Sequence, residues 1–238
     1  MAHNLKKFQT EAEYSAATLN YPAVSWITSG DTVMFDKATP AAFGGLTVKY
    51  DIADPSVEVN LFNGGGSSSS SSSESGSGSG GGGTLPSRMI VDGVEETPIN
   101  TWRFETAGVH TVQYEFTENA IPNNFLDNNG YVVEIEIGDE ITRIPDESAD
   151  GRPFGSCINL TSVTISSSVT YIGSGSFGNN AALTSITVKA LDPPTLGTEP
   201  FGETSGCTIY VPASSVEMYQ TSTSTGWSEY ASIIQAIP

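Results

Sequence analysis

Few residues in this chain have the chemistry of a catalytic group. Its 238 residues include two histidines and two cysteines. His3 lies near the N-terminus, and His110 stands in an alternating run of apolar and polar residues, where we expect a structural side chain rather than a general base. The sequence lacks the Gly-x-Ser-x-Gly, His-Glu-x-x-His and phosphate-loop motifs. We therefore expect no enzyme and no bound cofactor, and the alternative of a glycosidase built from distant carboxylates stays open.

The sequence Asp127-Asn128-Asn129-Gly130 invites comparison with a calcium-binding loop. An EF-hand loop has its glycine at position six, which would place Phe125 at position one, where a ligand oxygen is required. A tight turn is therefore the better interpretation. Two adjacent carboxylate pairs, Glu95-Glu96 and Asp139-Glu140, lie in expected loops and show no sign of a shared cleft. We expect no metal site at these residues.

The balance of charge excludes several classes of partner. Acidic residues outnumber basic ones by 27 to 9, and the formal net charge is −18. Residues 153–238 contain one basic residue, Lys189. Because there is no basic stripe, binding to nucleic acid or to an anionic membrane surface is disfavoured. No run of 18 apolar residues occurs, so no membrane insertion is expected. The acidic excess favours solubility, with cation binding as the alternative.

A pattern that recurs about every 23 residues organises the C-terminal half. Four short segments with strand-like alternation share it, at residues 133–137, 162–165, 185–188 and 208–211. Their last apolar residues are spaced by 28, 23 and 23 positions. A second ladder contains Phe154, Phe177 and Phe201, and a third contains Leu160, Leu183 and Cys207. Units of this length bury their apolar faces only by stacking on one another, which predicts a short β-solenoid.

Alternation along these four segments predicts one ordered surface. Residues such as Ile135 and Val163 should point into the core, and the residues between them should point outward. Two outward columns result: Glu134, Ser162, Ser185 and Thr208 in one, and Glu136, Thr164, Thr187 and Tyr210 in the other. We call these eight residues the outer columns. They are the candidate contact residues for a glycan or a neighbouring subunit, and a plain solvated face is the alternative.

The two cysteines, Cys157 and Cys207, belong to units two steps apart in this stack. Two strand spacings would put them roughly 10 Å apart. A disulfide needs Cα atoms within about 7 Å of each other. We therefore predict two buried free thiols that fill core positions, without a metal or redox role.

Upstream of the repeats, the chain divides into two further segments. Residues 1–38 contain a capping box, Thr10-Glu11-Ala12-Glu13, which predicts a short helix, followed by strands at 23–28 and 32–35 around a tight turn. We expect a small α+β docking module there. Residues 39–115 contain short alternating segments separated by turn signals, which predicts a β-sandwich.

A stretch of glycine and serine with one glutamate, residues 64–83, interrupts the predicted sandwich. Such a composition cannot bury apolar area. We interpret it as a flexible loop inside the sandwich domain, with a linker between two domains or an engineered insertion as alternatives. The repeats then occupy 116–212, and residues 213–238, with two short expected helices, would cap the stack. The predicted fold class is mainly β.

The run from residue 160 to 178, Leu-Thr-Ser-Val-Thr-Ile-Ser-Ser-Ser-Val-Thr-Tyr-Ile-Gly-Ser-Gly-Ser-Phe-Gly, resembles the BspA-like leucine-rich repeats that are abundant in Bacteroidales and their phages. Residues 193–196 and 207–212 resemble the usual ending of those proteins, and residues 102–114 resemble the strands that often precede such repeats. The resemblance covers residues 88–238. It implies a right-handed β-rich solenoid, a role in adhesion or surface display, and no catalytic residues.

The N-terminal sequence Met-Ala-His-Asn-Leu-Lys-Lys-Phe, with Ala12-Glu13-Tyr14 following, is similar to the starts of virion proteins of tailed phages that infect Bacteroidales, crAss-like phages included. The bacterial BspA-like proteins are typically exported, whereas no signal peptide is recognisable here. The two resemblances together imply a virion protein, which needs no export signal.

We therefore expect a non-enzymatic structural protein on the surface of a phage particle, made in the host cytoplasm. It would be a fibre or decoration protein attached to capsid or tail, with residues 1–38 docking to other virion proteins. We expect a homo-oligomer, and a host surface glycan or protein as a further partner. A BspA-like bacterial cell-surface adhesin and a glycan-binding module are the alternatives.

Overall fold

The computed structural model describes residues 5–7, 24–29, 32–37, 43–63, 85–117, 121–203 and 206–238. The chain divides into two compact units, Met1–Phe43 and Gly44–Pro238. Within the described ranges, helical structure is limited to α2 (Val216–Thr221) and two 3-10 helices, η1 (Ala213–Ser215) and η2 (Trp227–Ile233). The prediction of a mainly β protein is confirmed.

The first unit contains a three-stranded antiparallel sheet. Its strands are β1 (Leu5–Lys7), β2 (Val24–Ser29) and β3 (Thr32–Lys37), in the order β1-β3-β2. The pairing of β2 with β3 is the hairpin that the sequence predicts, whereas β1 is not predicted. The helix predicted from Thr10 to Ala17, and His3, lie outside the described residues.

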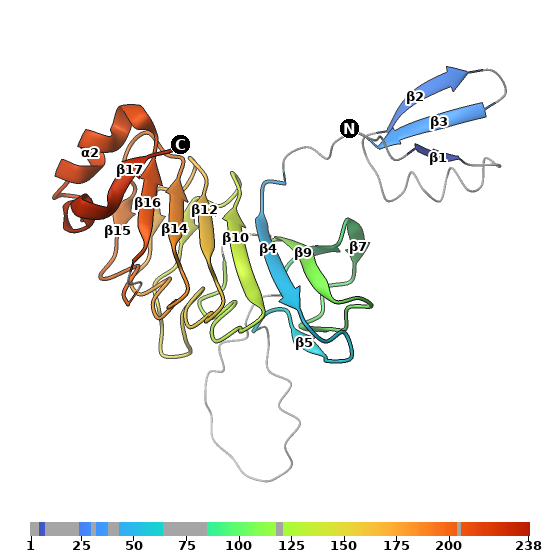
Figure 1. Ribbon diagram of the computed structural model, residues 1–238, viewed down its shortest axis with the longest axis horizontal. Coiled ribbons are helices and arrows are strands. Elements are labelled where there is room, and N and C mark those ends of the chain that lie inside the picture. The colour runs from blue at the N-terminus through green and yellow to red at the C-terminus, as the bar shows by residue number, and fades with distance from the viewer. Residues whose placement is uncertain are drawn as a thin grey trace, which may run out of the picture. The chain divides into compact units, whose positions relative to one another are not determined.

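One nine-stranded sheet runs through the second unit (Figure 1). Its antiparallel part contains β4 (Leu46–Ile52), β6 (Arg88–Val91), β7 (Val94–Glu96) and β9 (Gly108–Glu115). Its parallel part contains β10 (Val132–Ile137), β12 (Ser162–Ile165), β14 (Ser185–Val188), β16 (Thr208–Val211) and β17 (Ile234–Ala236). The order is β17-β16-β14-β12-β10-β4-β9-β6-β7, so β4 joins the two parts and lies antiparallel to both β9 and β10.

Two smaller sheets complete the second unit. Strands β11 (Arg143–Ile144), β13 (Tyr171–Ile172) and β15 (Thr195–Leu196) pair in parallel. Strands β5 (Val59–Asn60) and β8 (Thr101–Trp102) pair antiparallel. The repeats that begin with β10, β12 and β14 therefore each contribute one strand to the large sheet and one to the small parallel sheet, which gives a stack of similar turns of chain.

The predicted separate β-sandwich over residues 39–115 is not confirmed. Its longer strands belong to the same sheet as the repeats, and the second layer consists only of the two-residue strands β5 and β8. The reason is β4, which is hydrogen-bonded on both edges and so leaves no boundary near residue 115. The compact unit of residues 44–238 includes the predicted segments 116–212 and 213–238 and most of the predicted segment 39–115.

The Gly/Ser segment 64–83 lies outside the described residues, but both of its flanks belong to the second unit. Before it, β5 pairs with β8, and after it, β6 pairs with β9. A segment with both ends in one compact unit does not separate two domains, so the interpretation as a loop within a unit fits and that of a domain linker does not.

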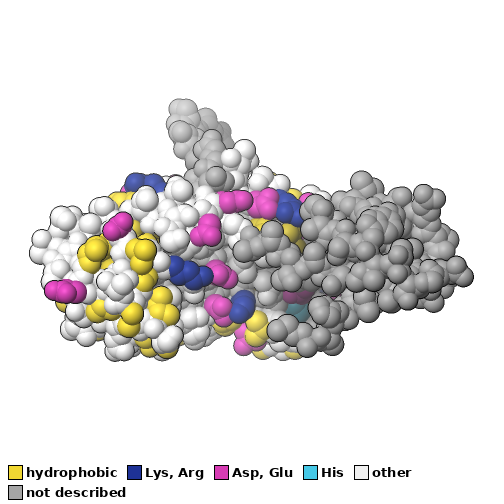
Figure 2. Space-filling model, turned by 90° about the horizontal axis from the view of Figure 1, so that it is seen from above, with side chains coloured by type: hydrophobic (Ala, Val, Ile, Leu, Met, Phe, Trp, Pro, Cys, Tyr) yellow, Lys and Arg dark blue, Asp and Glu magenta, His cyan; other side chains and the backbone are white. Residues whose placement is uncertain are grey.

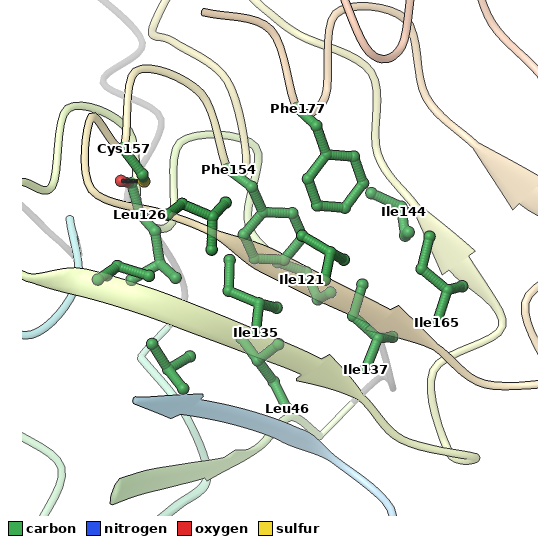
Figure 3. Close-up of a cluster of buried hydrophobic side chains, with 14 of the residues drawn as sticks. Leu46, Ile121, Leu126, Ile135, Ile137, Ile144, Phe154, Cys157, Ile165 and Phe177 are labelled. Atoms are coloured by element: carbon green, nitrogen blue, oxygen red, sulfur yellow. Dashed lines mark hydrogen bonds between the residues drawn. The ribbon is translucent and has the colours of Figure 1, made fainter. Parts of the chain in front are cut away.

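A continuous apolar core fills the second unit. Figure 3 shows the rings of Phe154 and Phe177 above the strand that carries Ile135 and Ile137. The centroids of these two rings are 5.1 Å apart, and Phe177 and Phe201 follow at 5.9 Å, so the predicted phenylalanine ladder is a column of stacked rings. Full burial of each ring contributes about 1.5–3 kcal/mol to folding.

Buried polar side chains form hydrogen bonds between one repeat and the next. The side chain of Asn180 donates to the carbonyl oxygens of Phe154 and Phe177, at 2.8 and 2.9 Å, and accepts from the backbone N–H of Cys157 at 2.8 Å. Cys157 takes the equivalent place one repeat earlier, because its thiol donates to the carbonyl oxygen of Leu126 at 3.1 Å. Both side chains therefore satisfy backbone groups that stacking would otherwise leave unpaired.

Both cysteines are buried and free, as predicted. Burial raises the pKa of the Cys157 thiol to about 12 and that of Cys207 to about 11. Each thiol therefore stays protonated at neutral pH, which Cys157 requires in order to donate its hydrogen bond.

Residues 213–238 close the C-terminal end of the stack. Trp227 is fully buried, its ring centroid lies 4.9 Å from that of Tyr219, and its Nε1 donates to the carbonyl oxygen of Pro194 at 2.6 Å. The helix predicted at 227–234 is the 3-10 helix η2, which ends at Ile233. Ile234 then begins β17, an unpredicted strand that adds to the edge of β16.

Candidate binding face

The outer columns lie on one face of the large sheet, as predicted. Strand register joins Glu134, Ser162, Ser185 and Thr208 in one row, and Glu136, Thr164, Thr187 and Tyr210 in the next. In β12, β14 and β16 every outer-column residue is half-buried and every residue between is buried. Close neighbours on a flat sheet partly cover one another, which explains this intermediate exposure.

Six of the eight outer-column side chains carry a hydroxyl. None of these six hydroxyls has a hydrogen-bond partner within the described parts of the chain. Threonines just before the strands behave differently. Thr161 Oγ1 donates to the carbonyl oxygen of Val133 at 2.9 Å, and Thr184 Oγ1 donates to that of Thr161 at 3.1 Å. Hydroxyls at the strand entrances therefore join repeats, whereas those of the outer columns keep their full capacity for a partner or water.

The two acids of the outer columns are each paired with a lysine. Lys49 Nζ lies 2.9 Å from Glu134 Oε2, and Lys189 Nζ lies 3.4 Å from Glu136 Oε1. All four side chains are 40 to 53% exposed, so each pair contributes only about 0–1 kcal/mol. Figure 2 shows basic side chains beside acidic ones on the surface seen from above. Because of these ion pairs, the outer columns form a polar surface with little net charge on a strongly acidic protein.

The structure extends this face beyond the residues that the sequence predicted. Thr47 and Lys49 of β4 pair with Glu136 and Glu134 on one side and with residues of β9 on the other. The alternation of residues 46–52 signals that Thr47 and Lys49 point outward. The pairing of β4 with β10 joins segments more than 80 residues apart, and no local pattern reports it.

A groove adjoins the first column where β4 meets β10. It encloses about 540 Å³, and its lining includes Asp51, Asp54, Tyr131, Val133 and Asn159. The register of β10 shifts between Val132 and Glu134, so Val133 is an extra residue opposite β4. Such a bulge bends its strand and redirects side chains, which accounts for a hollow at this point of a flat sheet. Sequence reasoning did not find the groove, because a bulge leaves no composition signal.

His110 has a structural environment, in line with the sequence interpretation. It is 8% exposed, and its ring nitrogens lie 2.7 Å from Asp92 Oδ2 and 2.9 Å from the Thr106 carbonyl oxygen. Burial lowers the pKa of His110, but the hydrogen bonds to Asp92 and Thr106 raise it by more, so the net shift is upward. Two acceptors facing the two ring nitrogens favour the imidazolium form, which makes the ring a poorer proton acceptor.

The segment Asp127-Asn128-Asn129-Gly130 forms the predicted tight turn. Asn128 has a φ of 60°, and the backbone N–H of Asn129 donates to the Leu126 carbonyl oxygen at 3.2 Å. Among the residues that the structure describes, no group of three or more His, Cys, Asp or Glu side chains is arranged to hold a metal ion. Glu95 and Glu96 lie in strand β7 rather than in the expected loop, and Glu95 forms an ion pair with Arg88 at 3.1 Å.

Comparison with protein-family models identifies the type of repeat. Residues 119–225 match the BspA type leucine rich repeat region in six copies. This part of the chain is similar to BspA-type leucine-rich repeats. The match includes β10, β12, β14 and β16, and thus all strands of the outer columns. It supports the resemblance stated from the sequence and, with it, a surface adhesion or binding module. A comparison with curated proteins returns no match.

No helix among the described residues combines the length and the apolar character that a membrane span requires.

Proposed function

We propose that this protein is a non-enzymatic binding module that contacts its partner through the outer columns. The observation that carries the proposal is the contrast between hydroxyls. Those at strand entrances, such as Thr161 and Thr184, bond to the preceding repeat, whereas the six of the outer columns bond to nothing in the described chain. The match of the repeats to the BspA type supports the same class of function.

The backbone beneath the outer columns is rigid, which favours binding. Each strand of the face is paired on both sides, and the residues that alternate with the columns are fully buried. Short serine and threonine side chains also lose little conformational freedom when a partner immobilises them. A partner with a regular array of hydroxyl, amide or carbonyl groups, as in a glycan or another sheet, would match rows spaced about 4.8 Å apart.

A substitution experiment tests this proposal. In the double variant Thr164→Arg/Thr187→Arg, two long charged side chains cover the centre of the face without touching the core. We expect binding of the purified protein to Bacteroidales cells or to phage particles to weaken at least about tenfold, with the unfolding midpoint unchanged. The control is Thr195→Arg, an exposed position on the small parallel sheet. Equal binding by both variants and the unaltered protein would contradict the proposal.

The finer part of the proposal is that a phage particle carries this module, as a capsid- or tail-attached fibre or decoration protein. Its support is the resemblance of residues 1–14 to the starts of phage virion proteins. In this arrangement the first unit docks to other virion proteins, the second unit displays the outer columns, and copies assemble symmetrically. Mass spectrometry of purified particles tests it, with presence in the particle expected.

The alternative is a BspA-like adhesin on a bacterial cell surface, and the match over residues 119–225 favours it equally. Detection of the protein on bacterial cells, together with its absence from purified particles, would establish the adhesin and overturn the phage proposal. Both outcomes retain the outer columns as the binding face.

A further inference from the structure

The groove beside β4 and β10 offers mainly hydrogen-bond acceptors. Asp54 Oδ1 accepts from the N–H and the hydroxyl of Ser56, at 2.9 and 2.7 Å, which fixes the carboxylate and leaves Oδ2 free. Asn159 Nδ2 donates to the Gly130 carbonyl oxygen at 2.6 Å, which leaves Oδ1 free. The carboxylate of Asp51 has no partner in the described part of the chain. A ligand that satisfies this set must bring donors, and a positive charge suits two carboxylates.

The same groove also has an apolar side. Val57, 38% exposed, and Val133 contribute to its lining, together with the ring of Tyr131. Ile158, 62% exposed, lies beside Gly130 of the lining, with its Cδ1 3.9 Å from the position that a Cβ of Gly130 would take. Exposed apolar side chains beside free carboxylates match a ligand that has an alkyl stem and a cationic end.

Among the described residues that line the groove, there is no lysine or arginine to compensate its two carboxylates. Elsewhere on this face, by contrast, Lys49 pairs with Glu134 and Lys189 pairs with Glu136. The groove is therefore a place beside the outer columns where acidic charge is left for a partner. A neutral sugar would leave both carboxylates uncompensated, and a divalent ion would make no use of the apolar side.

We propose that this groove binds a lysine or arginine side chain of a partner protein. The methylene stem lies against Val57 and Val133, and the cationic end lies beside Asp51 and Asp54. This inference rests on the proposed function, because it adds a charged anchor at the end of the outer columns. A net charge of −18 also favours association with a basic partner.

The test uses the full-length protein and short peptides, and it needs no identified partner. Acetyl-Gly-Arg-Gly-amide and acetyl-Gly-Lys-Gly-amide are titrated into ¹⁵N-labelled protein at low ionic strength. We expect saturable shifts of the amide signals of Asp51, Asp54, Tyr131 and Asn159. The isosteric double variant Asp51→Asn/Asp54→Asn should bind the peptides at least about tenfold more weakly, because both charge-assisted contacts are lost.

A matched control has the same net charge. In Asp192→Asn/Glu217→Gln, two exposed acids outside the groove are neutralised, and peptide binding should be unchanged. The peptide acetyl-Gly-Gln-Gly-amide, glucose and calcium chloride serve as neutral and metal probes. The inference is overturned if shifts spread over the whole acidic surface, if both double variants lose binding equally, or if a neutral or metal probe produces the same shifts.

The face variant Thr164→Arg/Thr187→Arg separates this inference from the proposed function. We expect it to retain the peptide shifts while it loses binding to cells or particles. If the face variant loses that binding and the unaltered protein shows no peptide shifts, the groove inference fails and the proposed function stands. If the peptides bind but the face variant binds cells or particles normally, the proposal that the outer columns bind the partner fails. The groove then remains a binding site for a cationic side chain.

Discussion

The two parts of the large sheet are stabilised in different ways. In the parallel part, the same contacts recur in each repeat, as in the stacked rings of Phe154 and Phe177. In the antiparallel part, the contacts do not repeat. There the hydroxyls of Tyr50 and Tyr114 lie 2.8 Å apart, and both lie within hydrogen-bond distance of the Leu61 carbonyl oxygen, so the three oxygens form one buried cluster. Contacts of one kind thus recur along the stack in the parallel part, whereas the antiparallel part adds a polar cluster that occurs once to the apolar core that both parts share.

Removal of the central ring of the stack should have the largest effect. Phe177 is fully buried between Phe154 and Phe201, so Phe177→Ala leaves a cavity bounded by two other repeats. We expect the free energy of unfolding to fall by about 3–5 kcal/mol, as measured by urea denaturation. The control Ile158→Ala, at a residue 62% exposed, should change it by less than about 0.5 kcal/mol. A similar small loss for Phe177→Ala would show that the repeats do not share one core.

Removal of the buried hydrogen bonds that join neighbouring repeats should have the next largest effect on stability. Asn180→Ala removes three hydrogen bonds and leaves the buried backbone groups of Phe154, Phe177 and Cys157 without that partner. We expect a loss of about 2–3 kcal/mol, because buried unpaired groups are costly. Cys157→Ala removes a thiol that contacts the carbonyl oxygens of Leu126 at 3.1 Å and Gly155 at 3.6 Å, and it should cost less because a thiol is a weak donor. Equal losses for the two variants would contradict the view that Asn180 has the larger share in joining repeats.

The antiparallel part should respond to pH through His110. Its folded pKa is raised above the ordinary value, because the hydrogen bonds to Asp92 and Thr106 outweigh the effect of burial. A raised folded pKa means that the stabilising contribution is fully present below the unfolded pKa of about 6.5 and is lost as pH rises through the folded pKa. The stability difference between the unaltered protein and His110→Gln should therefore shrink as the pH rises from below about 6.5 through the raised folded pKa.

The pH experiment also contains its own control. In Asp92→Asn, the carboxylate that bonds Nδ1 at 2.7 Å is replaced by a neutral amide, so the pH dependence of the stability difference should flatten. A variant in the parallel part, Cys157→Ala, should leave the pH dependence near neutral pH unchanged. The pKa of that thiol in the folded protein is raised to about 12, so the thiol stays protonated there. If His110→Gln shows no pH-dependent difference, the ring is not held as an imidazolium.

The parallel part was largely predictable from the sequence, and physical reasons explain why. Each repeat meets the same environment, so the same residue type recurs at the same position, as Phe154, Phe177 and Phe201 do. The alternation within residues 133–137, 162–165, 185–188 and 208–211 recurs with the same spacing, and it predicts both the strands and the direction of their side chains. The outer columns followed from that alternation residue by residue, and the structure places all eight of them on one face.

The strands of the antiparallel part were predicted from the sequence, but the pairing of these strands was not. Residues 46–52 and 109–116 alternate clearly, and β4 and β9 occupy nearly those positions. Alternation indicates which side chains are buried and says nothing about the neighbouring strand. The pairing of β4 with β10 depends on long-range contacts, and the bulge at Val133 depends on that pairing. For the same reason the groove, which those features form, was not predicted.

The smallest effect distinguishes the two kinds of threonine. Thr184→Val removes the bond from Oγ1 to the Thr161 carbonyl oxygen, and the free energy of unfolding should fall by about 0.5–1 kcal/mol. Thr187→Val, in the adjacent outer column, removes a hydroxyl without a partner in the described chain, so stability should stay within about 0.5 kcal/mol. Both substitutions keep the branched side-chain shape, and urea denaturation compares them directly.

Binding to cells or particles should show the opposite order. Thr187→Val removes a hydroxyl that faces the partner and should weaken binding, whereas Thr184→Val should leave binding unchanged. A destabilised but active Thr184→Val, beside a stable but weakened Thr187→Val, would assign structural and binding roles to residues three positions apart. If instead one variant loses both properties, the hydroxyls of the two positions serve the same purpose. The contrast from which the binding face was inferred would then be without functional meaning.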